Sequence, residues 1–275
     1  MYIYYLLLKR DIFLGISKMK LVFILLFIIN LLLFLYPIYF FSVYMPNDLV
    51  SFWDVIGKSF GGIPIELIER KTFEFPFSWL LLQLCVATII GNFIKDDLFS
   101  HSAFIRIRAK SIWALWMSKL VFCVILIGLF YFLLFGITWF ICELNGQMVN
   151  HWTEYSKDLM VFTKIKLSYS QTILYSILLN FGGSVCITIV YATLSLIVRT
   201  IYSYLICVSI LFSSVFSSNF IFIGNYTMLL RQPLFVESPL FSIYLSFVIQ
   251  IVLSLIFIII GGIYLSRIEI FTDHD

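Results

Sequence analysis

The ionisable side chains are the residues of this chain most able to do chemistry, and they are few. Lys and Arg number 18, Asp and Glu 15 and His three, so charged residues make up only 12% of the sequence. Their densest group is the segment 95–119, which carries five cations and two carboxylates: Lys95, Arg106, Arg108, Lys110, Lys119, Asp96 and Asp97. Cations set among Ile, Phe and Trp suit contacts with phosphate headgroups or with an acidic partner.

The sequence holds none of the familiar catalytic or cofactor motifs. Its three histidines form no HExxH pair, and its five cysteines show no CxxC spacing, so the pattern predicts no metal site and no disulfide framework. Gly57-Lys58-Ser59 matches the end of a phosphate-binding loop, but Phe52 stands where that loop needs its first glycine. We therefore expect no enzyme activity and no cofactor bound by this chain.

The composition indicates that the bilayer is the solvent of this chain. Apolar residues make up 62% of the sequence, and the mean hydropathy is +1.04. A soluble domain is about half apolar and about a quarter charged, so this chain has too few polar residues to cover a surface in water. A net charge of +3 is too small to suggest nucleic acid as a partner.

Six apolar runs are long enough to cross a membrane, since a span needs about 20 residues for a hydrocarbon core of about 30 Å. We therefore predict a single all-α polytopic membrane domain over residues 1–275. The predicted spans are about 21–43, 77–94, 120–142, 172–198, 204–223 and 240–265.

Two stretches outside the spans are predicted to be amphipathic helices. Segment 1–20 combines an apolar side with Lys9, Arg10, Lys18 and Lys20, which favours a helix lying on the inner leaflet. In the connection 44–75, Asn47 can cap a short helix that Gly61 and Gly62 would end.

The distribution of Lys and Arg predicts the orientation of the spans. With six crossings, the two termini, the basic loop and the turn at Arg199 share one side, which holds eleven Lys and Arg residues against seven on the other. Because Lys and Arg are enriched in cytoplasmic loops, both termini and the loop 95–119 are expected in the cytoplasm.

With these boundaries every charged residue lies in a connection or at an end. Buried charges usually mark ion paths, proton relays or catalysis, so this pattern disfavours a proton-coupled antiporter, an intramembrane protease and a voltage sensor. Neutral polar side chains within the spans either pack helices together or line a path or a dimer seam, and the sequence leaves both readings open. They include Asn30, Gln83, Asn180, Asn219 and Gln250.

The order of these parts resembles the membrane subunit of an ABC-2 type exporter. An amphipathic basic N-terminus (Tyr5–Lys20) precedes the first span, and a very short turn joins the fourth and fifth. The loop between the second and third spans carries Arg106-Ile107-Arg108, followed by Trp113, Trp116 and Lys119. The family includes small bacterial permeases for antimicrobial peptides and for cell-surface polymers. The connection 143–170 is longer than in the larger polymer exporters.

The resemblance implies where energy enters. In that family the loop between spans two and three docks on a separate ATP-binding subunit, which would hold ATP and magnesium. Here the coupling residues would be Asp96, Asp97, Phe104, Arg106, Arg108 and Lys110, with segment 1–20 as the interfacial helix beside them. Two permease copies and two ATPase copies would form the working unit in the bacterial cytoplasmic membrane, moving a peptide-like or amphipathic substrate outward.

Two other functions stay open on the sequence. One is a membrane scaffold or immunity protein that binds a toxin or partner through its outer connections, 44–75 and 143–170. The other is an enzyme acting on lipids or polyprenols at the membrane interface, which the lack of a polar catalytic cluster disfavours. Association with an ATP-binding protein discriminates the exporter from both.

Overall fold

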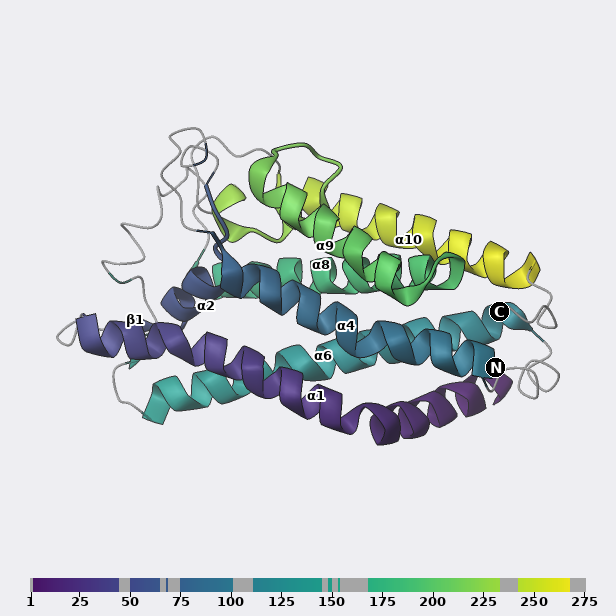
Figure 1. The fold of residues 1–275 in the computed structure, drawn as a ribbon. Helices are drawn as coiled ribbons and strands as arrows, with labels where there is room; N and C mark the ends of the chain where they lie inside the picture. The colour runs from purple at the N-terminus through teal and green to yellow at the C-terminus, as the bar shows by residue number, and fades with distance from the viewer. Residues whose placement is uncertain are drawn as a thin grey trace.

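A computed structural model describes residues 2–44, 50–64, 68, 75–100, 111–144, 148–149, 153, 168–232 and 242–267. Within these ranges, long helices lie side by side in an elongated bundle (Figure 1). They are α1 (Tyr2–Tyr44), α4 (Phe77–Ser100), α6 (Ile112–Leu144), α8 (Tyr169–Ile197), α9 (Thr200–Phe216) and α10 (Ile243–Arg267). All-helical architecture is therefore confirmed, apart from one pair of two-residue strands.

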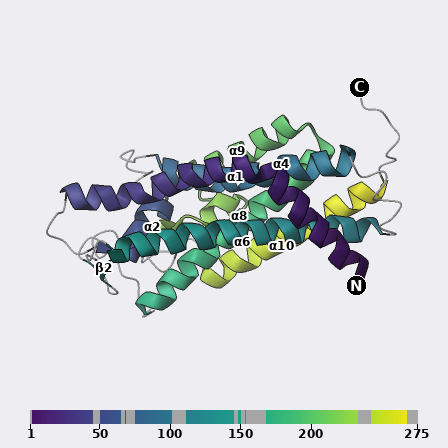
Figure 2. The same ribbon diagram turned by 90° about the horizontal axis from the view of Figure 1, so that it is seen from below.

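Helix α8 lies at the centre of the bundle, where it contacts α4, α6, α9 and α10. Helix α1 packs on α6 and α4 at the opposite flank from α10. Seen from below, the first part of α1 runs obliquely across α6 before the helix changes direction (Figure 2). The start of α1, the end of α4, the start of α6 and the end of α10 meet at one end of the bundle (Figure 1).

Four of the described helices are long and apolar enough to cross a membrane: α1, α6, α8 and α10. The described apolar stretch of α4, Phe77–Ala87, is shorter, and so is α9. Helix α9 has 17 residues, which at the rise of an α-helix gives about 25 Å against a core of about 30 Å. The chain is thus a membrane protein with four helices of spanning length and composition. Helix α4, with 24 residues, and the shorter α9 pack among them.

Each predicted span contains one of these helices, but the predicted fifth span, 204–223, is wrong in its second half. Helix α9 ends at Phe216, and the chain then turns into two short 3-10 helices, η1 (Ile223–Tyr226) and η2 (Leu229–Arg231). Asn219 makes this turn by accepting the Ile221 amide on its side-chain oxygen at 3.1 Å. An apolar run therefore continues past Phe216 without the backbone continuing as a helix. The short turn predicted at Arg199 is confirmed, because only Val198 and Arg199 separate α8 from α9.

The other end of the bundle carries a small cap built on α2 (Phe52–Phe60). The predicted short helix is therefore confirmed, but its cap is Ser51, which forms a reciprocal capping box with Asp54. Asn47 lies outside the described residues. Thr153 donates to Asp54 at 2.9 Å, and β1 (Val50–Ser51) pairs in parallel with β2 (Met148–Val149). The connections 44–75 and 143–170 thus meet.

Candidate functional site

The first turns of α1 are shaped to approach α6 closely. Leu7, Asp11, Gly15 and Met19 recur every four residues, which puts them on one face of the helix, and all four are buried. A Cβ at Gly15 would overlap the ring of Phe122 on α6, so glycine is what allows the two helices to come this near. At that separation Asp11 reaches the first turns of α6.

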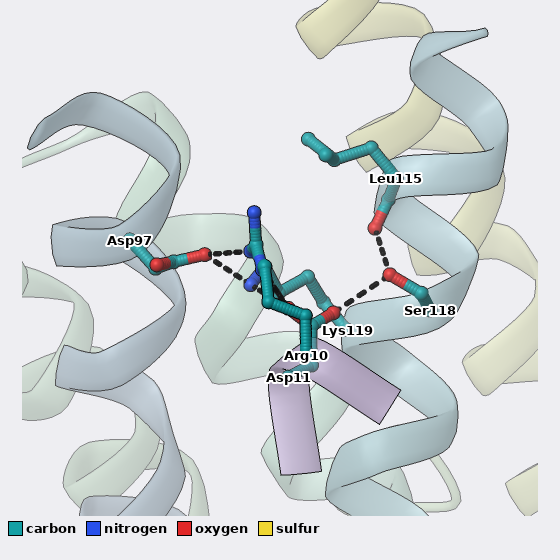
Figure 3. Close-up of polar contacts among 6 residues, drawn as sticks. All are labelled: Arg10, Asp11, Asp97, Leu115, Ser118 and Lys119. Atoms are coloured by element: carbon teal, nitrogen blue, oxygen red, sulfur yellow. Dashed lines mark hydrogen bonds and ion pairs between the residues drawn. The ribbon is translucent and has the colours of Figure 1, made fainter. Parts of the chain in front are cut away.

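Three helices contribute to a buried group of four charged side chains, which we call the charge cluster: Arg10, Asp11, Asp97 and Lys119 (Figure 3). The Lys119 ammonium donates to Asp11 at 2.6 Å and also to Asp97. Arg10 donates to Asp11 at 2.7 Å and also to Asp97. Each cation therefore bridges both carboxylates, and the contacts join α1, α4 and α6.

The charge cluster is well buried and electrically balanced. Lys119, Asp11 and Asp97 expose 0%, 1% and 2% of their side chains, and Arg10 exposes 23%. Two carboxylates and two cations sum to zero, which is the condition under which buried charges are tolerated. Ser118 adds a hydrogen bond to Asp11 at 2.7 Å, and the Lys119 ammonium lies 5.0 Å from the centre of the Phe93 ring.

The charge cluster keeps unused hydrogen-bonding capacity. One carboxylate oxygen of Asp97 (Oδ1) and one terminal nitrogen of Arg10 (Nη1) are buried without a hydrogen-bond partner among the described residues. Within the described ranges, no three His, Cys, Asp or Glu side chains gather as metal ligands.

The predicted coupling loop and the predicted interfacial helix meet in the charge cluster. Asp97 comes from the first and Arg10 from the second. The side chain of Asp96 and the whole of Phe104, Arg106, Arg108 and Lys110 lie outside the described residues. Lys9, Lys18 and Lys20 are exposed on α1. The helix predicted over 1–20 is present, and it continues without a break to Tyr44.

Two predictions about this region are wrong. The predicted loop covers 95–119, but α4 continues to Ser100 and α6 begins at Ile112. Trp116, which follows the basic part of that loop, is buried inside α6 and donates to the Ile258 carbonyl of α10 at 3.0 Å. Charged residues were also expected only in connections and ends, yet Asp97 and Lys119 lie buried inside helices. The reason is that these charges neutralise one another in ion pairs, so a helix can extend past the end of its apolar run.

The neutral polar residues divide into those that join two helices, one that bonds within its own helix and one on an exposed turn. Gln83 donates to Asn180 at 3.3 Å and accepts from Ser184 at 2.8 Å, so α4 and α8 are joined by hydrogen bonds at this level. Gln250 of α10 donates to the Leu179 carbonyl at 3.2 Å. Asn30 bonds to its own helix, at the Leu26 carbonyl, and Asn219 lies apart from the others on the exposed turn after α9.

Arg231 is a buried cation that lies apart from the charge cluster, in η2. Its guanidinium donates to the carbonyls of Ser214 at 2.6 Å, Val215 at 2.7 Å and Ile63 at 2.9 Å, and also to Asn225. It thus satisfies carbonyls at the C-terminal end of α9, where a cation is favoured. Burial lowers its pKa to about 10, which leaves it protonated at neutral pH.

The sequence does contain a signal for the charge cluster. Arg10-Asp11, Asp97 and Ser118-Lys119 each flank an apolar run at its end on the predicted inner side, and together they balance in sign. Comparison with known proteins adds nothing to this signal, because no family model, no curated protein and no solved structure matches the chain.

Proposed function

We propose that this chain is the membrane-spanning permease subunit of an ATP-driven exporter of the ABC-2 type. It would have six crossings, with the termini and the segment 101–111 in the cytoplasm. Its cargo would be peptide-like or amphipathic, and a separate ATP-binding subunit would supply the energy. The observation that carries the proposal is the charge cluster, because it fastens α4 and α6 to α1 near the two ends of segment 101–111.

The charge cluster gives that segment a mechanical connection to the bundle. A partner that moves the segment acts on the end of α4 and on the start of α6. Arg10 and Lys119 each bridge Asp11 and Asp97, so α1 follows the same displacement. Packed helices respond to such a push by moving as rigid bodies between discrete arrangements. The differential affinity of ATP for the two states of its own subunit would provide the free energy.

The test begins with the ATPase itself. The tagged chain is purified from its native membrane and its companions are identified, with the expectation that one carries a Walker A loop. The ATPase activity of the complex is then compared with that of the double variant Arg106→Glu, Arg108→Glu. Loss of stimulation is expected, because the change would place negative charge on the docking segment.

Two further variants make the result specific. Lys164→Glu, Lys166→Glu reverses the same amount of charge in the opposite connection and should leave ATPase stimulation intact. Asp97→Asn should preserve binding of the partner but weaken stimulation, because it removes charge from the link rather than from the docking surface. Normal stimulation in the Arg106, Arg108 double variant would overturn the coupling role. Purification without any ATP-binding companion would instead favour the scaffold or immunity function.

A further inference from the structure

A cavity of about 360 Å³ lies at the end of the bundle opposite the charge cluster. Its walls come from α1, α2, α4 and η2, so four separate parts of the chain frame it. This volume falls in the range of ligand sites, about 300–1,000 Å³.

Hydrogen bonds between residues of the lining and their neighbours fix the frame of the cavity. The Leu230 amide donates to the Gly61 carbonyl at 2.9 Å, which fastens η2 to the end of α2. Ser78 donates to the Ser59 carbonyl at 3.2 Å, which fastens α4 to α2. The cavity is therefore preformed, and a ligand would not have to order its walls before binding.

Most of the lining is apolar, and its rim is aromatic. Leu33 and Pro37 of α1 and Leu230 form apolar walls, while Tyr36 and Phe77 border the cavity with exposed fractions of 57% and 65%. Exposed aromatic side chains of this kind favour the boundary between hydrocarbon and headgroups. The cavity is thus lined to accept an apolar chain from the membrane side.

Among the described residues that line the cavity, Lys58 carries the charge. It is exposed on the last turn of α2, lines the cavity, and holds its ammonium 4.9 Å from the centre of the Phe40 ring. It forms no salt bridge with any residue in the described part of the chain. An ammonium at the edge of an apolar cavity attracts a phosphate or a carboxylate as a point charge.

We propose that this cavity binds an amphiphile that carries an anionic group on an apolar chain. The anionic group would contact Lys58, and the chain would lie against Leu33, Pro37 and Leu230. Two sources share this chemistry: a phospholipid of the bilayer and a free single-chain amphiphile. The site does not depend on the proposed exporter function, because a scaffold with this fold would bind the same ligand.

The experiment is a titration of the detergent-purified chain followed by native mass spectrometry. Phosphatidylglycerol is compared with phosphatidylcholine, and dodecyl phosphate with dodecylphosphocholine, so that the members of each pair share their apolar chains and differ in the headgroup, which is anionic in one and zwitterionic in the other. The wild type should prefer the anionic member of at least one pair. Lys58→Gln should weaken binding of that member by about tenfold and leave the zwitterionic member unchanged. Lys58→Arg keeps the charge and should keep the preference.

Three comparisons decide the outcome. Lys18→Gln removes an exposed cation at the other end of the bundle and should have no effect. Ser78→Phe should fill the cavity and reduce binding of both members of a pair. A preference confined to phosphatidylglycerol assigns the site to membrane lipid, and one confined to dodecyl phosphate assigns it to a free amphiphile.

Equal binding of the anionic ligand by wild type and Lys58→Gln would overturn the proposed site. Equal losses of binding in Lys58→Gln and Lys18→Gln would overturn it as well. Neither Lys58→Gln nor Lys18→Gln should change association with an ATPase. This test and the test of the exporter function can therefore fail independently.

Discussion

Buried ionisable side chains are costly in a protein surrounded by lipid, and they persist where they are paired. Lys119 is fully buried and contacts both Asp11 and Asp97. Lys119 therefore supplies the fully buried one of the two cations that balance these carboxylates. From the sequence pattern, Arg10 belongs to the predicted interfacial helix and Asp97 to the predicted coupling loop, and the pattern does not indicate that the two side chains touch. Their separation of 87 residues is closed only by the packing of three helices.

Replacing Lys119 with Met tests the cost of unbalancing the charge cluster. The change keeps the length of the side chain but leaves two buried carboxylates facing Arg10 alone. We expect the free energy of unfolding to fall by about 3–5 kcal/mol, the usual cost of removing one partner from a buried ion pair. Denaturant unfolding in detergent micelles measures it, with the exposed Lys18→Met as the matched control.

A second variant separates lost pairing from lost packing. Asp97→Asn combined with Lys119→Met removes one charge of each sign, so Arg10 and Asp11 remain as a balanced pair. We expect the double variant to be more stable than the sum of the two single variants indicates. Strict additivity, or a Lys119→Met variant as stable as Lys18→Met, would contradict the pairing seen in the structure.

Arg231 offers a test of geometry rather than charge. Its planar guanidinium reaches carbonyls on two separate segments, at Val215 in the last turn of α9 and at Ile63 after α2. A lysine would keep the charge but would not reach both, because its donors radiate from one atom. Arg231→Lys should therefore lower the free energy of unfolding by about 2 kcal/mol, through buried carbonyls left without donors. The exposed Arg267→Lys should change it by less than about 0.5 kcal/mol.

At the scale of elements, the apolar runs predicted where helices lie better than where they end. The sequence located a helix in all six runs because each is long, apolar and bounded by polar residues. It missed the extra turns of α4 and α6, since ion pairs there replace water as the partners of charged side chains. It also missed the end of α9, because the residues that stop the helix include Arg231, whose approach depends on tertiary structure.

The packing of α8 makes a prediction about two glycines. A Cβ at Gly183 would overlap Thr227, which lies between η1 and η2, whereas a Cβ at Gly136 of α6 would meet nothing within 4 Å. Gly183→Ala should therefore destabilise the fold by about 1–3 kcal/mol, the usual cost of overpacking. Gly136→Ala should stabilise it by up to about 1 kcal/mol, because alanine favours a helix. Equal effects at the two positions would show that α8 does not pack this tightly.

At the scale of the whole molecule, the order of the apolar runs predicts the order of the helices along the chain, but it does not predict which helices pack together. Composition establishes the membrane class, and the runs give the sequence of helices. Neither says that α8 lies at the centre or that α1 crosses α6, because periodicity is weak when a helix faces lipid on one side and apolar protein on the other. The meeting of the connections 44–75 and 143–170 at Asp54 and Thr153 is likewise a long-range contact that the sequence pattern does not contain.

The proposed topology makes the last prediction. Ser218, on the turn after α9, and Ser266, on the last turn of α10, are both exposed and lie at opposite ends of the bundle. The five native cysteines are buried and free, so they should contribute little background to thiol labelling. In intact cells a membrane-impermeant maleimide should label Ser218→Cys and not Ser266→Cys, and permeabilised cells should show both. Labelling of Ser266→Cys alone would invert the orientation and would remove segment 101–111 from the reach of a cytoplasmic ATPase. Labelling of both in intact cells would contradict the proposed topology, which puts the two positions on opposite sides of the membrane.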